Sequence, residues 1–223
     1  MQLNTEIKNA RHQKILNFKL PFYTLSEEIM SSITHGLGVF FSVVALVLLI
    51  IKSPKDFQNI FSISIYGATL IILYTISTIY HALKINRAKK VFRKLDHCSI
   101  FLLIAGTYTP ICALLLRGNI GTIILCCVWV TAILGVVLNS IDVNKFSKFS
   151  LACYLVMGWA VVFAIKPLIA SITPTQMWWL FAGGAFYTIG AIIYVIGKKI
   201  RYMHSVWHLF VLAGSICHFM MIY

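Results

Sequence analysis

Acidic side chains are scarce in this chain. Only six Asp and Glu residues occur among 223, and all charged residues together make up 11%, whereas a soluble domain averages about 25% because its surface must face water. Hydrophobic residues account for 60% of the sequence, and the mean hydropathy is +0.87. The composition therefore excludes an ordinary soluble domain and predicts a protein that crosses a membrane several times.

The chain also lacks paired cysteines and a secretory signal peptide. Its six cysteines form no C-x-x-C pair, and most fall inside apolar runs, which excludes the usual pattern of a disulfide framework or a thiolate metal site. The first residues are polar and basic, and no small-residue cleavage site precedes the first apolar run. We therefore expect that run to remain as a membrane span.

The net charge of +13 would suit a nucleic-acid partner if the basic residues formed one patch. Apolar runs instead divide them into short clusters. Basic clusters beside membrane spans contact anionic lipid head groups and set the topology. We expect membrane lipids as partners and no nucleic acid, and we leave the oligomeric state open.

Seven apolar runs are long enough to cross a bilayer, which takes about 20 helical residues. The predicted spans are Ile33–Ile51, Ile60–Leu83, Ser99–Leu116, Gly121–Asn139, Phe149–Ile165, Met177–Gly197 and Tyr202–Tyr223. The sequence thus predicts an all-α, polytopic seven-transmembrane helix bundle over residues 26–223. Residues 1–25 form a basic, interfacial N-terminal segment that we expect to be partly disordered.

The distribution of lysine and arginine predicts the orientation of the bundle. Of the 19 basic residues, all but Lys52, Lys55, Arg117 and Lys166 fall in the N-terminal segment and in alternate connections between the predicted spans. Because basic connections stay on the cytoplasmic side, we expect a cytoplasmic N-terminus and an outer C-terminus, in the inner (plasma) membrane of the cell.

Three histidines share one predicted depth in this topology. His204 and His208 lie four residues apart at the start of the seventh span, so both imidazoles lie on one helical face. His81 ends the second span at the same leaflet. Three neutral imidazoles with an open position form the usual ligand set of a catalytic Zn²⁺. We predict His81, His204 and His208 as zinc ligands in the cytoplasmic leaflet.

Two polar residues at the same depth are candidates for the chemistry. Asp96 opens the third span and would hold or deprotonate a water molecule, and Ser77 lies one turn before His81 on the same face. Asp96 could instead be a loop carboxylate paired with Arg93 or Lys94.

A polar stripe opens the first span. Glu28, Ser31, Ser32 and His35 follow the i, i+3, i+4, i+7 pattern of one helical face. Glu28 and His35 could support the site, with Ser31 beside them, or the stripe could serve helix capping and packing alone.

Two other histidines are placed outside the metal site. His218 lies ten residues beyond His208, about 15 Å further along a helix, so it cannot bind the same ion. His97 should point away from the face of Asp96 and lie at the interface, where it could act as a spare ligand.

Together these motifs resemble the hemolysin III family, within the larger progestin and adipoQ receptor group. The resemblance covers nearly the whole chain from Glu27. Its motifs are Glu28-x-x-Ser31-x-x-x-His35-Gly, Ser77-x-x-x-His81, Leu95-Asp96 leading into Ile104-Ala-Gly-Thr-Tyr-Thr-Pro110, and His204-x-x-x-His208 with His218-Phe. The family often has Asn where this chain has Ser31, and a hydroxyl replaces only part of the hydrogen bonding of an amide.

The resemblance implies a seven-helix bundle, a cytoplasm-side zinc held by His81, His204 and His208, and Asp96 close by. It also implies kinship with alkaline ceramidases, with hydrolysis of a lipid amide as the favoured chemistry or a related role in membrane-lipid homeostasis. The alternatives are a cytolytic, pore-forming protein and a receptor-like regulator with a structural zinc.

Overall fold

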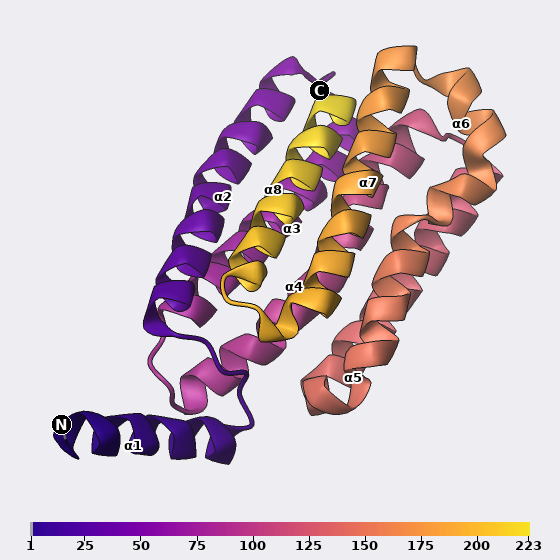
Figure 1. The fold of residues 1–223 in the computed structure, drawn as a ribbon. Helices are drawn as coiled ribbons and strands as arrows, with labels where there is room; N and C mark the ends of the chain where they lie inside the picture. The colour runs from indigo at the N-terminus through magenta and orange to yellow at the C-terminus, as the bar shows by residue number, and fades with distance from the viewer. Residues whose placement is uncertain (1) are drawn as a thin grey trace.

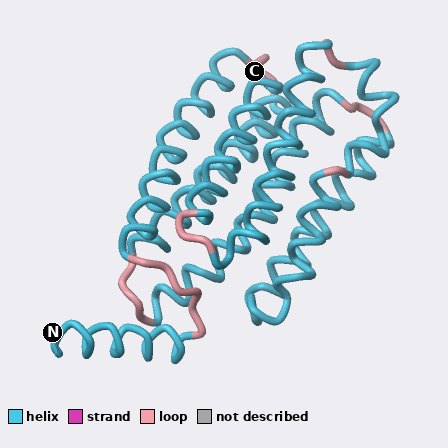
Figure 2. Tube along the Cα trace, in the orientation of Figure 1, coloured by secondary structure: helices cyan, strands magenta, loops and turns pink. Residues whose placement is uncertain are grey.

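Helices make up the architecture of residues 2–223, the part of the chain that this computed structural model describes, and no strand occurs among them. The α-helices are α1 (Gln2–Phe18), α2 (Leu25–Lys52), α3 (Phe57–Ala82), α4 (Arg87–Pro110), α5 (Asn119–Gly158), α6 (Ile165–Ser171), α7 (Pro174–Ile196) and α8 (Met203–Ile222) (Figure 1). Short π or 3-10 segments follow three of them: η1 (Ile111–Leu115), η2 (Ala160–Ala164) and η3 (Gly197–Lys199). Figure 2 shows that short loops connect the helices.

Within residues 2–223, six helical stretches are long and apolar enough to cross a membrane. The longest, Asn119–Ser171, has 53 residues, and the chain doubles back within it (Figure 1). It contains both the fourth and the fifth predicted spans. The structure therefore confirms an all-helical protein with six to seven potential spans, while the side of the membrane that each end faces stays a prediction.

The reversal inside α5 is built by Asp142. Its backbone leaves helical geometry, with φ −152° and ψ 104°, and its Oδ1 accepts hydrogen bonds from the backbone N–H groups of Asn144 and Lys145, as an N-cap does. Across the hairpin, the buried Ser150 hydroxyl donates to Oδ1 of Asn139 at 2.9 Å. Asp142 thus begins a second helix within the connection that the sequence predicts between Asn139 and Phe149.

The outer surface of the bundle is apolar. Phe40 is 63% exposed, Ile133 57% and Phe163 88%. Large exposed apolar side chains suit contact with lipid and would be unfavourable in water. Several polar residues of α2, α3 and α4 instead turn inward, and Ser31, Ser77 and Asp96 are buried.

The N-terminal segment is helical over Gln2–Phe18, and the expected partial disorder stays a prediction; Met1 lies outside the described residues. Helix α1 lies across one end of the bundle (Figure 1) and ends at Phe18. The next residue, Lys19, has a φ of 53°, the left-handed geometry that follows many helix C-termini. Helix α2 then starts with a capping box in which Thr24 and Glu27 bond each other's backbone. This cap positions Glu28 in the first turn.

A proline and a glycine shape α4 and α7. Pro110 ends α4 and is followed by the π segment η1, in which the N–H of Leu116 reaches the carbonyl of Ile111; proline lacks the N–H that a regular helix needs. On α7, a Cβ added at Gly183 would lie 2.8 Å from the His218 ring. Glycine there lets α7 and α8 pack closely.

The connections rich in basic residues gather at one end of the bundle. The α3–α4 loop, the reversal in α5 and the α7–α8 connection all lie at the end where α1 crosses (Figure 1). This is the grouping that alternate connections predict. The site described next lies toward the same end.

Candidate metal centre

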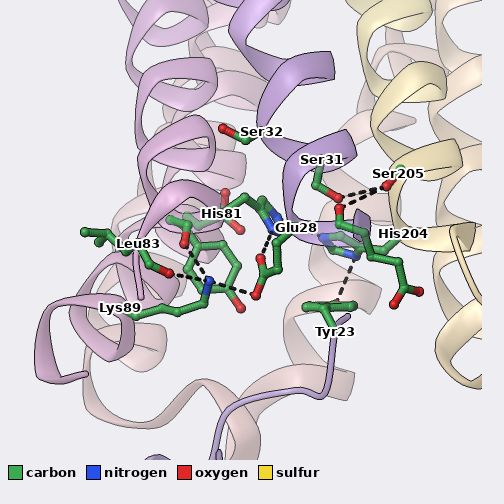
Figure 3. Close-up of polar contacts among 12 residues, drawn as sticks. Tyr23, Glu28, Ser31, Ser32, His81, Leu83, Lys89, His204 and Ser205 are labelled. Atoms are coloured by element: carbon green, nitrogen blue, oxygen red, sulfur yellow. Dashed lines mark hydrogen bonds and ion pairs between the residues drawn. The ribbon is translucent and has the colours of Figure 1, made fainter. Parts of the chain in front are cut away.

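His81, His204 and His208 come together although more than a hundred residues separate the first from the other two. Each offers a ring nitrogen, and these atoms lie within 4.8 Å of one another. Nε2 of His81 is 3.2 Å from Nε2 of His204. The short α7–α8 connection returns the chain so that the first turns of α8 face the last turn of α3 (Figure 3).

A carboxylate holds the ring of His81. Its Nδ1–H donates to Oε2 of Glu28 at 2.7 Å, and Oε1 of Glu28 forms an ion pair with Nζ of Lys89 at 2.8 Å (Figure 3). Lys89 also donates to the backbone carbonyls of Tyr80 and Leu83, both at 3.0 Å. A proton fixed on Nδ1 leaves a lone pair on Nε2, as in the carboxylate–histidine pairs that support metal ions.

Oxygen atoms also contact Nδ1 of the other two imidazoles. Nδ1 of His208 lies 3.2 Å from the carbonyl oxygen of Ser31 and 3.3 Å from the hydroxyl of Thr34. Because a carbonyl only accepts, Nδ1 of His208 carries the proton. Nδ1 of His204 lies 3.2 Å from the hydroxyl of Tyr23, and burial raises the pKa of Tyr23, so this partner stays a neutral hydroxyl.

This arrangement fits a metal ion. The remaining ring nitrogen of His208, Nε2, is buried and has no hydrogen-bond partner, which is costly unless something else binds it. Zn–N bonds of about 2.05 Å in a tetrahedron place two ligand nitrogens about 3.3 Å apart. The 3.2 Å between Nε2 of His81 and of His204 matches that spacing.

Asp96 and Ser77 lie beside the histidines but outside the three-ligand group. Both are buried, and Asp96 lies close to Ser77 and His81. The alternative in which Asp96 is a surface carboxylate paired with Arg93 or Lys94 does not hold among the described side chains, because neither forms an ion pair with it: Arg93 donates to Lys19 and Asn144, and Lys94 to backbone carbonyls of α5.

Two hollows meet at Asp96. The first, which we call the apolar cavity, runs into the bundle and is lined by residues such as Leu73, Ile100, Tyr154, Trp159 and Val211. The second, which we call the vestibule, opens beside the N-terminal segment and is lined among others by Lys19, Tyr23, Arg93, Lys198, Arg201 and His204. Asp96 and His97 line both. Nδ1 of His97 lies 3.8 Å from Oδ2 of Asp96, so the expectation that the His97 side chain points away from the face of Asp96 is wrong.

The remaining predicted residues have distinct places. His35 stacks on His208, with ring centroids 3.6 Å apart, and both of its ring nitrogens are buried without a partner. The hydroxyl of Ser31 pairs with that of Ser205 at 2.9 Å (Figure 3), while Ser32 donates to α3. His218 stacks on Tyr187 and lies outside the ligand group, as the helix arithmetic predicts.

Three residues of the site are missing from the sequence prediction. Thr34 lies three residues after Ser31, so the helical period of the polar stripe could have indicated it. Lys89 resembled a topology-setting loop residue, although it is 3% exposed. Tyr23 precedes α2 in a loop, and no local pattern places a loop residue against His204.

The fold and the cluster define a multi-pass helical membrane protein with a three-histidine group, two members buried and one partly buried, that could hold a metal ion. The model of the family described as Haemolysin-III related matches residues 23–219, and the chain belongs to this family.

Relatives of the chain agree with that assignment. Hemolysin-3 of Bacillus cereus is 41% identical over 193 residues, covering 86% of this chain and 88% of the relative. A Hemolysin-3 homolog of Bacillus subtilis (strain 168) is 42% identical over 199 residues, covering 88% and 93%. More distantly, the human Monocyte to macrophage differentiation factor is 26% identical over 222 residues, covering 94% and 90%.

Proposed function

We propose that this protein is a metal-dependent hydrolase of lipid amides, with Zn²⁺ held by His81, His204 and His208. The observation that carries the proposal is the buried, unpartnered Nε2 of His208 beside the Nε2 atoms of His81 and His204. Bound there, Zn²⁺ would polarise a carbonyl group and lower the pKa of water.

The two hollows support a lipid as the substrate. An acyl chain suits the apolar cavity, and a polar head suits the vestibule, which offers about 750 Å³, the size of an ordinary small-molecule site. A bond near Asp96 would then lie beside the histidines. The preference for an amide bond comes from the resemblance to alkaline ceramidases.

The chain's own residues have separable roles in this proposal. Asp96, where the two hollows meet, accepts the proton of the attacking water. Ser77 holds a water or a substrate oxygen through its buried hydroxyl beside Asp96. Glu28 fixes the tautomer of His81, and the carbonyl of Ser31 fixes that of His208.

A turnover assay tests the proposal. Purified protein in detergent is given a short-chain ceramide and other lipid amides, and released fatty acid is measured. We expect release by the native protein, and a fall of about a hundredfold or more in Asp96→Asn with bound metal retained, because a positioned base contributes at least that factor. His208→Ala should lose both metal and activity, whereas His12→Ala, at an exposed position of α1, should change neither.

Two results would contradict the hydrolase. Release that is equal in native protein and Asp96→Asn would come from a contaminant or from chemistry elsewhere. A metal-loaded native protein that releases no fatty acid from any lipid amide would make the ion structural, as in a receptor-like regulator.

A further inference from the structure

We infer that the vestibule binds a phosphate group on the head of a lipid. The statement that this lipid is the substrate rests on the proposed function. The binding of the phosphate group is independent of it. The proposal narrows the substrate class to lipid amides whose polar end carries a phosphate.

The lining of the vestibule is strongly basic. Lys19, Arg93, Lys198 and Arg201 come from three separate parts of the chain and line one hollow. None of the four forms an ion pair with a carboxylate among the described side chains. Several cations without a close counter-ion in one concave site attract an anion more than scattered surface charges do.

Two carboxylates, Glu27 and Asp96, also line the vestibule. Oε2 of Glu27 accepts from the backbone and hydroxyl of Thr24, and its Oε1 accepts from the backbone of Tyr202 at 3.0 Å. Asp96 lies where the vestibule meets the apolar cavity. Four basic residues against two carboxylates leave the lining with a formal charge of +2.

Arg93 is the best-placed anion ligand. Its Nη1 donates to the carbonyl of Lys19 at 2.9 Å and its Nη2 to Oδ1 of Asn144 at 2.8 Å, and both acceptors are neutral. Its Nε is buried with no partner. The guanidinium is thus oriented and charged. Two of its five N–H donors are used, and guanidinium groups suit phosphate oxygens in geometry and charge.

Membrane topology alone would also place basic residues at this end of the bundle. The experiment must therefore separate the effect of a basic residue that lines the vestibule from the effect of positive charge elsewhere at the same end. Lys84 and Lys90 provide the matched control. Both are exposed in or near the α3–α4 connection, at the same end of the bundle, and neither lines the vestibule. Lys84→Gln/Lys90→Gln removes the same charge as Lys198→Gln/Arg201→Gln.

The test measures binding by the thermal stability of the full chain in uncharged detergent. The probes are short-chain ceramide 1-phosphate, the same ceramide without phosphate, and inorganic phosphate. We expect the phosphorylated lipid to bind native protein more tightly than the neutral one. Lys198→Gln/Arg201→Gln should weaken its binding about thirtyfold, since each basic group near an anionic lipid contributes about a fivefold factor, and the control pair should weaken it less than threefold.

Arg93→Lys supplies a second variant, because it keeps the charge and loses the oriented guanidinium, and it should also bind the phosphorylated lipid more weakly. Equal binding of the two ceramides, or equal losses in the vestibule and control pairs, would overturn the proposal. Inorganic phosphate that binds as tightly as the lipid would show a free-phosphate site instead. His208→Ala leaves the vestibule intact, so retained binding in this variant would separate phosphate recognition from any failure of the hydrolase.

Discussion

Glu28 is predicted to serve the histidine cluster and the buried Lys89 at once, and the two roles can be separated. Glu28→Gln removes the charge that holds His81 at 2.7 Å and Lys89 at 2.8 Å. Loss of a carboxylate that supports a ligand typically lowers metal affinity 10- to 100-fold, or about 1.4–2.8 kcal/mol. Breaking one side of a buried ion pair costs about 3–5 kcal/mol of stability.

Lys89→Met tests the other partner. The side chains of Glu28 and Lys89 are 11% and 3% exposed, so either change alone leaves a buried charge without its counter-ion. In Lys89→Met the Glu28 carboxylate still accepts the hydrogen bond from His81. The metal affinity of this variant should therefore stay within about fivefold of native, a smaller loss than the one expected for Glu28→Gln. The double variant Glu28→Gln/Lys89→Met leaves neither charge and should be less destabilised than the two single changes together, with a coupling of about 1–3 kcal/mol.

The assay has two readouts. Metal affinity is measured by competition with a chromophoric chelator, and stability by unfolding in mixed micelles with increasing sodium dodecyl sulfate. The double variant should recover stability and keep the weak metal affinity of Glu28→Gln. If Glu28→Gln binds metal as tightly as native protein, or if Lys89→Met weakens metal binding as much, Glu28 is only the counter-ion of Lys89 and the reasoning is refuted.

Two further changes probe the surroundings of the cluster. Tyr23→Phe removes the hydroxyl beside Nδ1 of His204 and should weaken metal binding about tenfold in the chelator assay, whereas Tyr223→Phe, at the far end of α8, should leave it unchanged; no loss in Tyr23→Phe would contradict a supporting role. Gly183→Ala places a Cβ 2.8 Å from the His218 ring and should cost about 1–3 kcal/mol in mixed-micelle unfolding. Gly158→Ala meets nothing within 4 Å and is the matched control, so equal stabilities would contradict the close packing.

The membrane spans could be predicted because bilayer thickness sets a length and a hydropathy that a single sequence displays. Even the fourth and fifth spans, which run on as one helical stretch, were separable at the polar residues around Asp142. The first residue of α2 was less predictable, because serine and threonine are both good N-caps and Ser26 fits by residue type as well as Thr24. Thr24 is the N-cap because its hydroxyl accepts the hydrogen bond from the backbone N–H of Glu27.

The ligand group could be predicted from depth. His81 and His204 lie far apart in sequence, but short connections and alternating spans bring them to one end of the bundle. The partners of the ring nitrogens could not be predicted in the same way. Lys89 reaches Glu28 only because the α3–α4 loop folds the first turn of α4 back over the end of α3, and that contact depends on side-chain geometry between helices.

Metal content measured by mass spectrometry on detergent-purified protein tests the central claim most directly. Native protein and the exposed-histidine control His12→Ala should each carry a single zinc ion per chain, and His81→Ala and His208→Ala should carry none while keeping native helical content. A well-folded native protein without bound metal, or His208→Ala with the same metal content as native, would contradict the three-histidine site.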